Sequence, residues 1–174
     1  IRMRLVGSEM CIRDRSNMTP SEVHRLHAPV KAWFQQQGWT PQAFQEEVWE
    51  AFARGQDGLL QAPTGSGKTY AAMGHVLSAA AVSKRSSRGV KLVWVAPLRA
   101  LSADIADAAR AMVAGLGLDW EVGTRTGDTS AKEKAKQRTA LPDILITTPE
   151  SLHILIAQKG GAEPVSYTHL TLPT

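Results

Sequence analysis

The stretch QAPTGSGKT at residues 61–69 places the strongest constraint on how this chain can fold. It follows a short apolar run and precedes an alanine-rich segment, which is the context of a strand that ends in a loop and passes into a helix. In that arrangement backbone N–H groups converge near the helix N-terminus, where they can hold an anion. Gly65 and Gly67 allow the dihedral angles that such a loop requires. The stretch therefore predicts a phosphate-binding loop within an α/β fold.

The side chains of this loop predict which nucleotide groups they contact. Lys68 is expected to reach the β- and γ-phosphates of a triphosphate, and the Thr69 hydroxyl to ligate Mg²⁺, so both are assigned a catalytic role. The usual pattern begins with Gly where this chain has Ala62, and the alternative is a Gly-rich turn with an incidental lysine. The predicted nucleotide-binding residues are Trp39, Gln45, Thr64, Gly65, Ser66, Gly67, Lys68 and Thr69.

Two of these residues lie upstream of the loop and are candidates for binding the base. A glutamine amide can bond both N6 and N7 of adenine, so Gln45 would select ATP over GTP. Trp39 is expected to pack beside the base. The alternatives are a surface glutamine on a helix and a core tryptophan under the first helices. ATP and Mg²⁺ are thus the expected cofactors.

Helical patterns precede the loop. In MTPSEVHRL, Thr19 is the expected N-cap with Pro20 at the first helical position, and Pro29 is expected to interrupt this helix before a second short one ends at Gly38. TPQAFQEEVWEAFARG predicts a helix that is capped by Thr40 and ends at Gly55, with apolar residues at helical spacing.

Strand and helix patterns alternate from residue 58 onward. Strands are expected at 58–62, 90–97, 120–125 and 142–149, and helices at 70–83, 101–115, 130–138 and 150–158. Buried strands that alternate with helices predict a parallel sheet covered on both faces. The expected fold is therefore α/β, in a single domain.

Both ends of the chain differ from the rest. Val165–His169 can be encoded by DNA whose reverse complement encodes Met10–Asp14, and the strings LVGSEMCIRD and VSYTHLTLPT resemble translated read-through of sequencing adapters. We therefore divide the chain into an adapter-like segment at 1–15, a native segment at 16–163 and a second adapter-like segment at 164–174. The two ends are expected to be unstructured or arbitrarily placed.

Composition adds little once the ends are set aside. The formal net charge is +4 and the pI is about 9.5, but the first segment holds four arginines against two acidic residues, so charge alone does not indicate nucleic acid. The one cysteine, Cys11, lies in that segment as well, which leaves no disulfide for the native part. No apolar run approaches the length of a membrane span. We expect a soluble, cytoplasmic protein.

The ordered motifs resemble those of superfamily-two helicases. FQ at Gln45 resembles the Q motif and APTGSGKT motif I; APLRAL at 96–101 resembles motif Ia, RTGDT at 125–129 the glycine-containing strand-binding motif, and TTPESL at 147–152 motif Ib. Within the superfamily the chain is similar to the Lhr-like, ligase-associated DEXH-box DNA helicases. The resemblance implies a RecA-like P-loop NTPase fold with three layers and a mostly parallel sheet, truncated before the DEXH strand.

The resemblance also implies a track for one nucleic-acid strand at the carboxyl ends of the strands. Threonine hydroxyls, arginines and a close glycine backbone would hold phosphates, which makes binding nonspecific and salt-sensitive. Lys132 and Lys136 lie on one face of the charged helix. Either they contact nucleic acid beside this track, or they belong to an ordinary solvated helix. His24 and His27 form an H-x-x-H spacing for which no further metal ligand is apparent. The predicted nucleic-acid-binding residues are Arg99, Arg125, Thr126, Gly127, Thr148 and Pro149.

The implied function is the N-terminal ATP-binding portion of an ATP-dependent DNA helicase. It would couple hydrolysis to movement on single-stranded DNA and to unwinding, in DNA repair, with partly duplex nucleic acid, a DNA ligase and a nuclease as partners. No Asp-Glu pair follows TTPESL, so this chain alone is expected to be inactive and poorly stable. The alternatives are a non-catalytic ATP sensor that binds nucleic acid, an RNA helicase fragment and a nucleotide kinase, in which APLRAL and TTPESL would have no role.

Overall fold

The computed structural model describes residues 2–3, 18–83 and 89–158. Its helices are α2 (Pro20–Gln36), α3 (Ala43–Ala53), α4 (Lys68–Ser83), α5 (Arg99–Gly115), α6 (Ala131–Thr139) and α7 (Pro149–Gln158). Its strands are β1 (Arg2–Met3), β2 (Gly58–Leu59), β3 (Leu92–Val95), β4 (Val122–Arg125) and β5 (Ile144–Thr147). The remaining residues of the two adapter-like ends lie outside the described residues, and the division of the chain into 1–15, 16–163 and 164–174 stays a prediction.

Three of the strands form the predicted parallel sheet, in the order β3-β5-β4. Val95 and Arg125 are both paired with Thr147, so the three strands end level with one another. The central strand β5 is buried along its whole length. This confirms the parallel arrangement that the alternating pattern predicted, and it brings the segments that follow the strands to one edge.

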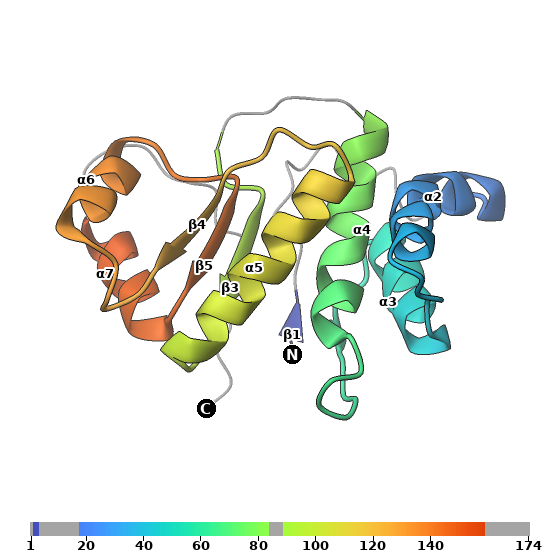
Figure 1. Cartoon of the computed structure of the whole chain (residues 1–174), viewed down its shortest axis with the longest axis horizontal. Helices are drawn as coiled ribbons and strands as arrows, with labels where there is room; N and C mark the ends of the chain where they lie inside the picture. The colour runs from blue at the N-terminus through green and yellow to red at the C-terminus, as the bar shows by residue number, and fades with distance from the viewer. Residues whose placement is uncertain (1, 4–17, 84–88, 159–174) are drawn as a thin grey trace.

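Helices cover this sheet and extend the molecule to one side. Figure 1 shows α5 in front of the sheet, α4 beside α5, and α2 and α3 at the opposite end of the molecule from α6 and α7. Ile144 and Ile146 point into the core shared with α5, whereas Leu145, between them, is buried on the other face together with Leu152 and Leu155 of α7. Both faces of β5 are therefore covered, as expected for an α/β fold.

One carboxylate joins the beginnings of the three strands. Asp143 pairs with the Lys91 ammonium, and its other carboxylate oxygen accepts a 2.8 Å hydrogen bond from the Glu121 backbone N–H. The Lys91 ammonium also lies 5.0 Å from the centre of the Trp120 ring, a cation–π contact. These contacts align the strand starts and lie at the end of the sheet remote from the predicted sites.

The strand before the phosphate loop does not join the three-stranded sheet. β2 comprises two exposed residues and is paired, antiparallel, with β1. The prediction of a five-residue buried strand at 58–62 was wrong in length and burial. A short apolar run becomes a buried strand only when neighbouring strands satisfy its backbone groups, and within the described residues no strand connects β2 to β3.

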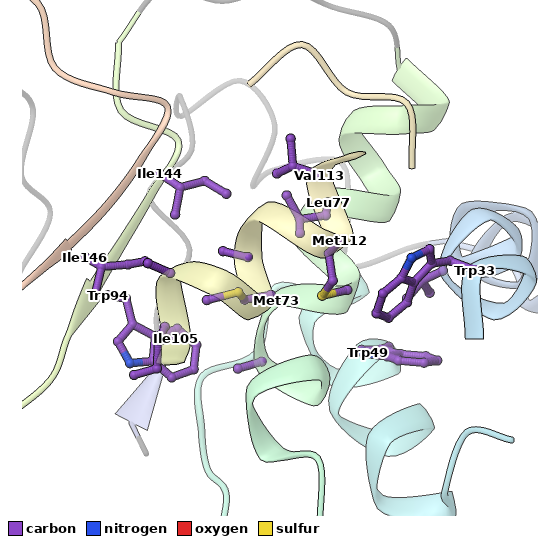
Figure 2. Close-up of a cluster of buried hydrophobic side chains, with 14 of the residues drawn as sticks. Trp33, Trp49, Met73, Leu77, Trp94, Ile105, Met112, Val113, Ile144 and Ile146 are labelled. Carbon is purple, nitrogen blue, oxygen red and sulfur yellow. The ribbon is translucent and has the colours of Figure 1, made fainter. Parts of the chain in front are cut away.

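The core runs continuously from the helices to the sheet. Figure 2 shows Trp33 and Trp49 at one end of this cluster and Trp94, Ile144 and Ile146 at the other. Between them lie side chains of α4 and α5, including Met73 and Met112. The helices approach closely where glycine permits it, because a Cβ on Gly74 would lie 2.7 Å from the Trp49 ring. The sheet and the helix that follows the phosphate loop therefore share one packed core.

The first helix crosses its proline without interruption, contrary to the prediction. Thr19 and Glu22 form the expected capping box, but α2 continues through Pro29 to Gln36. Where the proline disturbs the helical ladder, Ser78 of α4 inserts its hydroxyl: Oγ accepts from the Val30 N–H at 3.2 Å and donates to the Leu26 carbonyl at 2.7 Å. The helix tolerates Pro29 because a side chain from another helix satisfies the freed backbone groups.

The second helix starts later than its Thr-Pro pair indicated. Its N-cap is Gln42, not Thr40, because Gln45 three residues onward accepts a 2.9 Å hydrogen bond from the Gln42 N–H. Its buried residues are Gln45, Trp49, Phe52 and Ala53. Gly55 ends the helix with a positive φ of 72°, as predicted.

A pair of buried histidines connects α2 to α4. His27 Nε2 lies 2.9 Å from His75 Nδ1, and the two rings meet edge to face. Burial, and to a lesser extent the nearby Lys31 ammonium, lowers the pKa of His27 to about 4. The H-x-x-H spacing thus reflects a packing role for His27, which is neutral near pH 7. Within the described residues, no helix combines the length and the apolar character that a membrane crossing needs.

Candidate nucleotide and nucleic-acid sites

The predicted phosphate loop connects β2 to α4. Gly65 and Gly67 have φ angles of 80° and 85°, the left-handed conformation that favours glycine, and α4 begins at Lys68. Ser66 turns back on the loop, since its N–H and its hydroxyl both donate to the Pro63 carbonyl. The loop therefore has the glycine conformation and the helix start that the sequence predicted.

Lys68 lies over this loop. Its ammonium donates to the backbone carbonyls of Ala62 and Pro63, each at 2.6 Å. These carbonyls hold a cation where a triphosphate would bring negative charge, so the lysine must exchange them for phosphate oxygens when a nucleotide binds. The residues fit a triphosphate in this sense: a mobile ammonium, two glycines and a helix N-terminus lie together, with Thr69 as the second residue of α4.

Gln45 lies directly behind the loop. Its side-chain Nε2 donates to the Gly67 carbonyl at 3.1 Å, while Oε1 accepts from Gln42. A Cβ on Gly67 would lie 2.7 Å from that nitrogen, so this position requires glycine for space as well as for its φ. Gln45 is 3% exposed. In this structure one end of its amide joins α3 to the loop and the other caps α3 at Gln42, a role that sequence reasoning missed.

Trp39 belongs partly to the core and partly to the surface. It is 43% exposed, and its ring meets those of Trp33 and Phe34 edge to face. Tyr70, which directly follows Thr69 on α4, lies 5.4 Å from it between ring centres. An aromatic surface therefore lies beside the loop. Trp39 packs on the core with one part of its ring and leaves another part exposed, so it combines the two alternatives, a core tryptophan and one that packs beside a base.

The predicted nucleic-acid segments meet at the carboxyl ends of the three strands. The Ala96 N–H donates to the Thr147 carbonyl at 2.9 Å, and the Thr147 hydroxyl donates to the Arg125 carbonyl at 2.7 Å. Segments that lie far apart in the chain are thereby held together by hydrogen bonds at the sheet edge. Thr147 was not assigned to the site, but it lies at the end of the central strand and connects the segments that follow the two outer strands.

Arg99 and Gly127 are in direct contact at this edge. The Arg99 guanidinium lies so close to Gly127 that an added Cβ would be 2.8 Å from its central carbon, which explains why a glycine is needed there. Arg99 Nη1 also pairs with Asp128 Oδ1 at 2.7 Å, and both side chains are well exposed. Asp128 is a site residue that sequence reasoning missed, although its place within RTGDT was a usable signal.

Arg125 was expected to line the track with Arg99 and Gly127, but its side chain is not at the surface. It is 4% exposed, and its guanidinium points beneath α6 toward the Lys134 carbonyl and Gln137 Oε1, each at 3.4 Å. Burial and the charge of Arg138 lower its pKa. Successive side chains of a strand point to opposite faces. Arg125 is the last residue of β4, and its side chain points to the inner face, under α6. In this structure the Arg125 guanidinium is therefore buried beneath α6, and a phosphate contact for this residue stays a prediction.

The two remaining threonines mainly shape the backbone. The Thr126 hydroxyl accepts from the Asp128 N–H at 3.3 Å, and the Thr148 hydroxyl accepts from the Ser151 N–H at 3.4 Å, where α7 begins at Pro149. Thr126 and Thr148 are 8% and 5% exposed. They form the turns at the sheet edge, and little of their own surface is available to a strand in this structure.

Of the lysines on α6, the one nearest the edge was not singled out. Lys134 Nζ donates to the Gly127 carbonyl at 3.0 Å. Lys136 instead pairs with Glu121 Oε1 at 2.6 Å, which raises the pKa of this lysine. The helix therefore approaches the predicted track, but through Lys134, whereas Lys136 is directed elsewhere.

Comparisons with known proteins agree with this arrangement. The family model described as DEAD/DEAH box helicase matches residues 42–171. The Lhr helicase/uracil glycosylase of Escherichia coli is 33% identical over 151 residues, which cover 75% of this chain and 10% of that protein. The ATP-dependent helicase Lhr-Core of Methanothermobacter thermautotrophicus is 35% identical over 166 residues, or 85% of this chain and 19% of that protein.

A solved structure shows the same relationship in three dimensions. The helicase Lhr of Mycobacterium smegmatis, bound to ssDNA and AMP-PNP, superposes with a TM-score of 0.62 at 32% identity. The match covers 74% of this chain and 18% of that one. The chain thus spans between a tenth and a fifth of the length of these relatives.

Proposed function

The chain belongs to the DEAD/DEAH box helicase family, and from that premise we propose that it is the N-terminal ATP-binding part of an ATP-dependent DNA helicase. Similarity to Lhr helicases supports this assignment over an unrelated P-loop enzyme. The fold is the α/β, RecA-like arrangement of such domains. We infer further that the parent protein moves along single-stranded DNA, unwinds duplexes during DNA repair and works in the cytoplasm.

One observation supports the proposal most directly: Arg99 lies against Gly127. Arg99 begins α5 after β3, and Gly127 lies in the turn after β4; they meet because β3 and β4 flank β5 with level carboxyl ends. Positive charge beside exposed glycine backbone, at this edge, suits the phosphates of a nucleic-acid strand. A P-loop enzyme without a polymer substrate has no need of this second arrangement.

On the nucleotide side, ATP with Mg²⁺ would supply the free energy of hydrolysis. Thr64–Thr69 would hold the phosphates through backbone N–H groups, Lys68 through its ammonium, and the Thr69 hydroxyl would be the magnesium ligand. Gln45 would keep the loop in place from behind, and Trp39 would lie near the base.

On the nucleic-acid side, Arg99 would pair with phosphates while Gly127, Thr148 and Pro149 contribute backbone close to the strand. Such contacts carry little sequence information, so binding should be nonspecific and should weaken with salt. The finer proposals are that DNA is preferred to RNA, that a ligase and a nuclease are partners of the parent, and that this chain alone does not turn over ATP.

The test is Lys68→Ala in the full-length parent. We expect ATP turnover stimulated by single-stranded DNA to fall at least about 100-fold, because a positioned charge at the phosphates is lost. Lys31→Ala, which removes a surface lysine of α2, is the matched control and should leave turnover unchanged.

The outcomes separate the competing functions. Unchanged nucleotide affinity and turnover in Lys68→Ala would remove this lysine from its role. ATP binding without turnover in the unmodified parent would favour the non-catalytic sensor. Stimulation by RNA and not by DNA would identify an RNA helicase.

A further inference from the structure

The ion pair between Arg99 and Asp128 connects the two loops that are proposed to contact nucleic acid. We propose that Asp128 occupies, in the free protein, the position on Arg99 that a nucleic-acid phosphate takes on binding. The carboxylate thus competes with the strand and sets both its affinity and its salt dependence. This inference rests on the proposed function and identifies a residue that regulates the same site.

The chemistry of the two competitors is closely matched. A carboxylate and a phosphate both accept hydrogen bonds from the planar guanidinium with the same charge sign and similar geometry. Asp128 Oδ1 lies 2.7 Å from Arg99 Nη1, while the rest of the guanidinium rests on Gly127. The face of Arg99 nearest the strand-binding backbone is therefore already paired with an anion.

The turn around Asp128 keeps the carboxylate in this position. The Thr126 hydroxyl accepts from the Asp128 N–H, and Thr129 Oγ1 accepts from the Thr126 N–H at 2.9 Å. From the other side, Lys134 Nζ donates to the Gly127 carbonyl at 3.0 Å. A backbone fixed on both sides presents Asp128 to Arg99, so the pairing does not depend on a freely rotating loop.

The pair is suited to exchange. Arg99 and Asp128 are 61% and 69% exposed, and ion pairs this accessible to water are weak. A phosphate can therefore displace the carboxylate. After displacement the Asp128 carboxylate stays close to the phosphate that replaces it. The freed carboxylate retains a cation there, which offsets the cation that the phosphate releases, so the affinity depends less steeply on salt concentration.

The experiment measures single-stranded DNA binding by fluorescence anisotropy across a salt series, with the wild-type protein and Asp128→Asn at full length. In Asp128→Asn we expect about fivefold tighter binding at low salt, and a plot of log affinity against log salt that is steeper by up to about 0.7, the value for one single-strand phosphate whose cation release is no longer offset by a carboxylate.

The matched control is Asp107→Asn. Asp107 also forms an exposed pair with an arginine of α5, Arg110, at 2.8 Å, but it lies two helical turns beyond Arg99. Asp107→Asn removes the same charge as Asp128→Asn, and at this distance the effect of the charge on a phosphate at Arg99 is screened by salt. We expect its affinity and salt slope to match the wild type. Circular dichroism melts verify that every variant is folded.

Arg99→Ala, made in both backgrounds, tests the competition itself. The arginine should matter more once its competitor is gone, so Arg99→Ala should weaken binding several-fold more in Asp128→Asn than in the wild type. Weaker binding in Asp128→Asn would show that Asp128 positions Arg99, and equal effects of Arg99→Ala in both backgrounds would show that the pair is irrelevant; either result overturns the inference. If the wild-type protein itself does not bind DNA, the proposed function fails first.

Discussion

The two halves of the molecule hold their loops by different means. In the sheet half, residues 89–158, the segments at the carboxyl edge follow three strands joined by parallel backbone pairing. In the helical half, residues 18–83, the phosphate loop follows a two-residue strand outside that sheet. Side chains support the loop instead: Gln45 of α3 bonds to it directly, and Ser78 and the buried histidines join α2 to α4, the helix that follows it.

This difference predicts where the protein is vulnerable. Backbone pairing survives most substitutions, because every residue except proline offers the same N–H and C=O groups. Support by side chains depends on particular residues and on their protonation state. We therefore expect the nucleotide loop to lose its support under changes that leave the nucleic-acid edge intact, and four experiments test this contrast.

Trp49→Ala should have the greatest effect. Trp49 is fully buried, and α4 lies against its ring at Gly74, so truncation should cost about 3–5 kcal/mol of unfolding free energy. Urea denaturation measures this, and hydrogen exchange should show α4 losing protection before β5 does. Trp39→Ala, at a half-exposed position, should cost about 1 kcal/mol. Equal losses of protection in α4 and β5 would contradict the contrast between the halves.

Ser78→Ala and Thr147→Val compare one buried hydroxyl from each half. Ser78 satisfies two backbone groups at the Pro29 disturbance, so its loss should cost about 2–3 kcal/mol. Thr147 donates to one neighbouring-strand carbonyl, and its loss should cost about 1–2 kcal/mol because the ladder remains. Chemical denaturation measures both. A larger cost at Thr147 would reverse the ranking of the two halves.

Acidification should weaken the helical half through His27. Burial lowers its pKa from an ordinary 6.5 to about 4, so the unfolded chain binds the proton more readily, and stability present above pH 6.5 declines as the pH falls toward 4. We expect a loss of about 1–2 kcal/mol between pH 7 and pH 5. The pKa of Glu22 is itself lowered by hydrogen bonds to Thr19, which keeps that carboxylate out of this window.

Denaturation at several pH values measures this loss, and His27→Gln provides the control. Glutamine cannot titrate, so the variant should be less stable at pH 7 but less sensitive to pH. Lys31, Glu46 and His24 also act on His27 and remain in both proteins. The same pH dependence in His27→Gln would assign the effect to another group.

The Lys31–Glu46 pair should contribute least. It joins α2 to α3 at 2.5 Å, but both side chains are partly exposed. A double-mutant cycle with alanine should give a coupling of about 0.5 kcal/mol or less. A coupling well above that value would show that surface charge, and not the core, holds the helical half together.

Sequence reasoning succeeded where neighbours along the chain decide the outcome. The phosphate loop, the capping box at Thr19 and each helix from α4 to α7 follow from local patterns, as does the parallel order of alternating strands and helices. It failed at Pro29, where a breaker is tolerated because Ser78 comes from a helix 48 residues away. It failed at 58–62 because burial of a strand depends on which strands lie beside it.

The same division applies to the site. The phosphate-loop pattern indicated Lys68, and the helicase-like motifs indicated Arg99 and Gly127, which lie in contact in the structure. These patterns did not indicate that Arg125 turns inward, that both ends of the Gln45 amide are engaged, or that Asp128 faces Arg99. Those facts concern side-chain direction, which a motif does not encode.

From its letters alone this chain could be assigned a nucleotide-binding α/β fold, because glycine conformation, helix capping and apolar periodicity are short-range properties. Which polar side chains reach the surface, and which support the backbone instead, was decided by tertiary packing. The physical reason is that a buried polar group must find a hydrogen-bond partner, and the nearest one in space is seldom the nearest one in the chain.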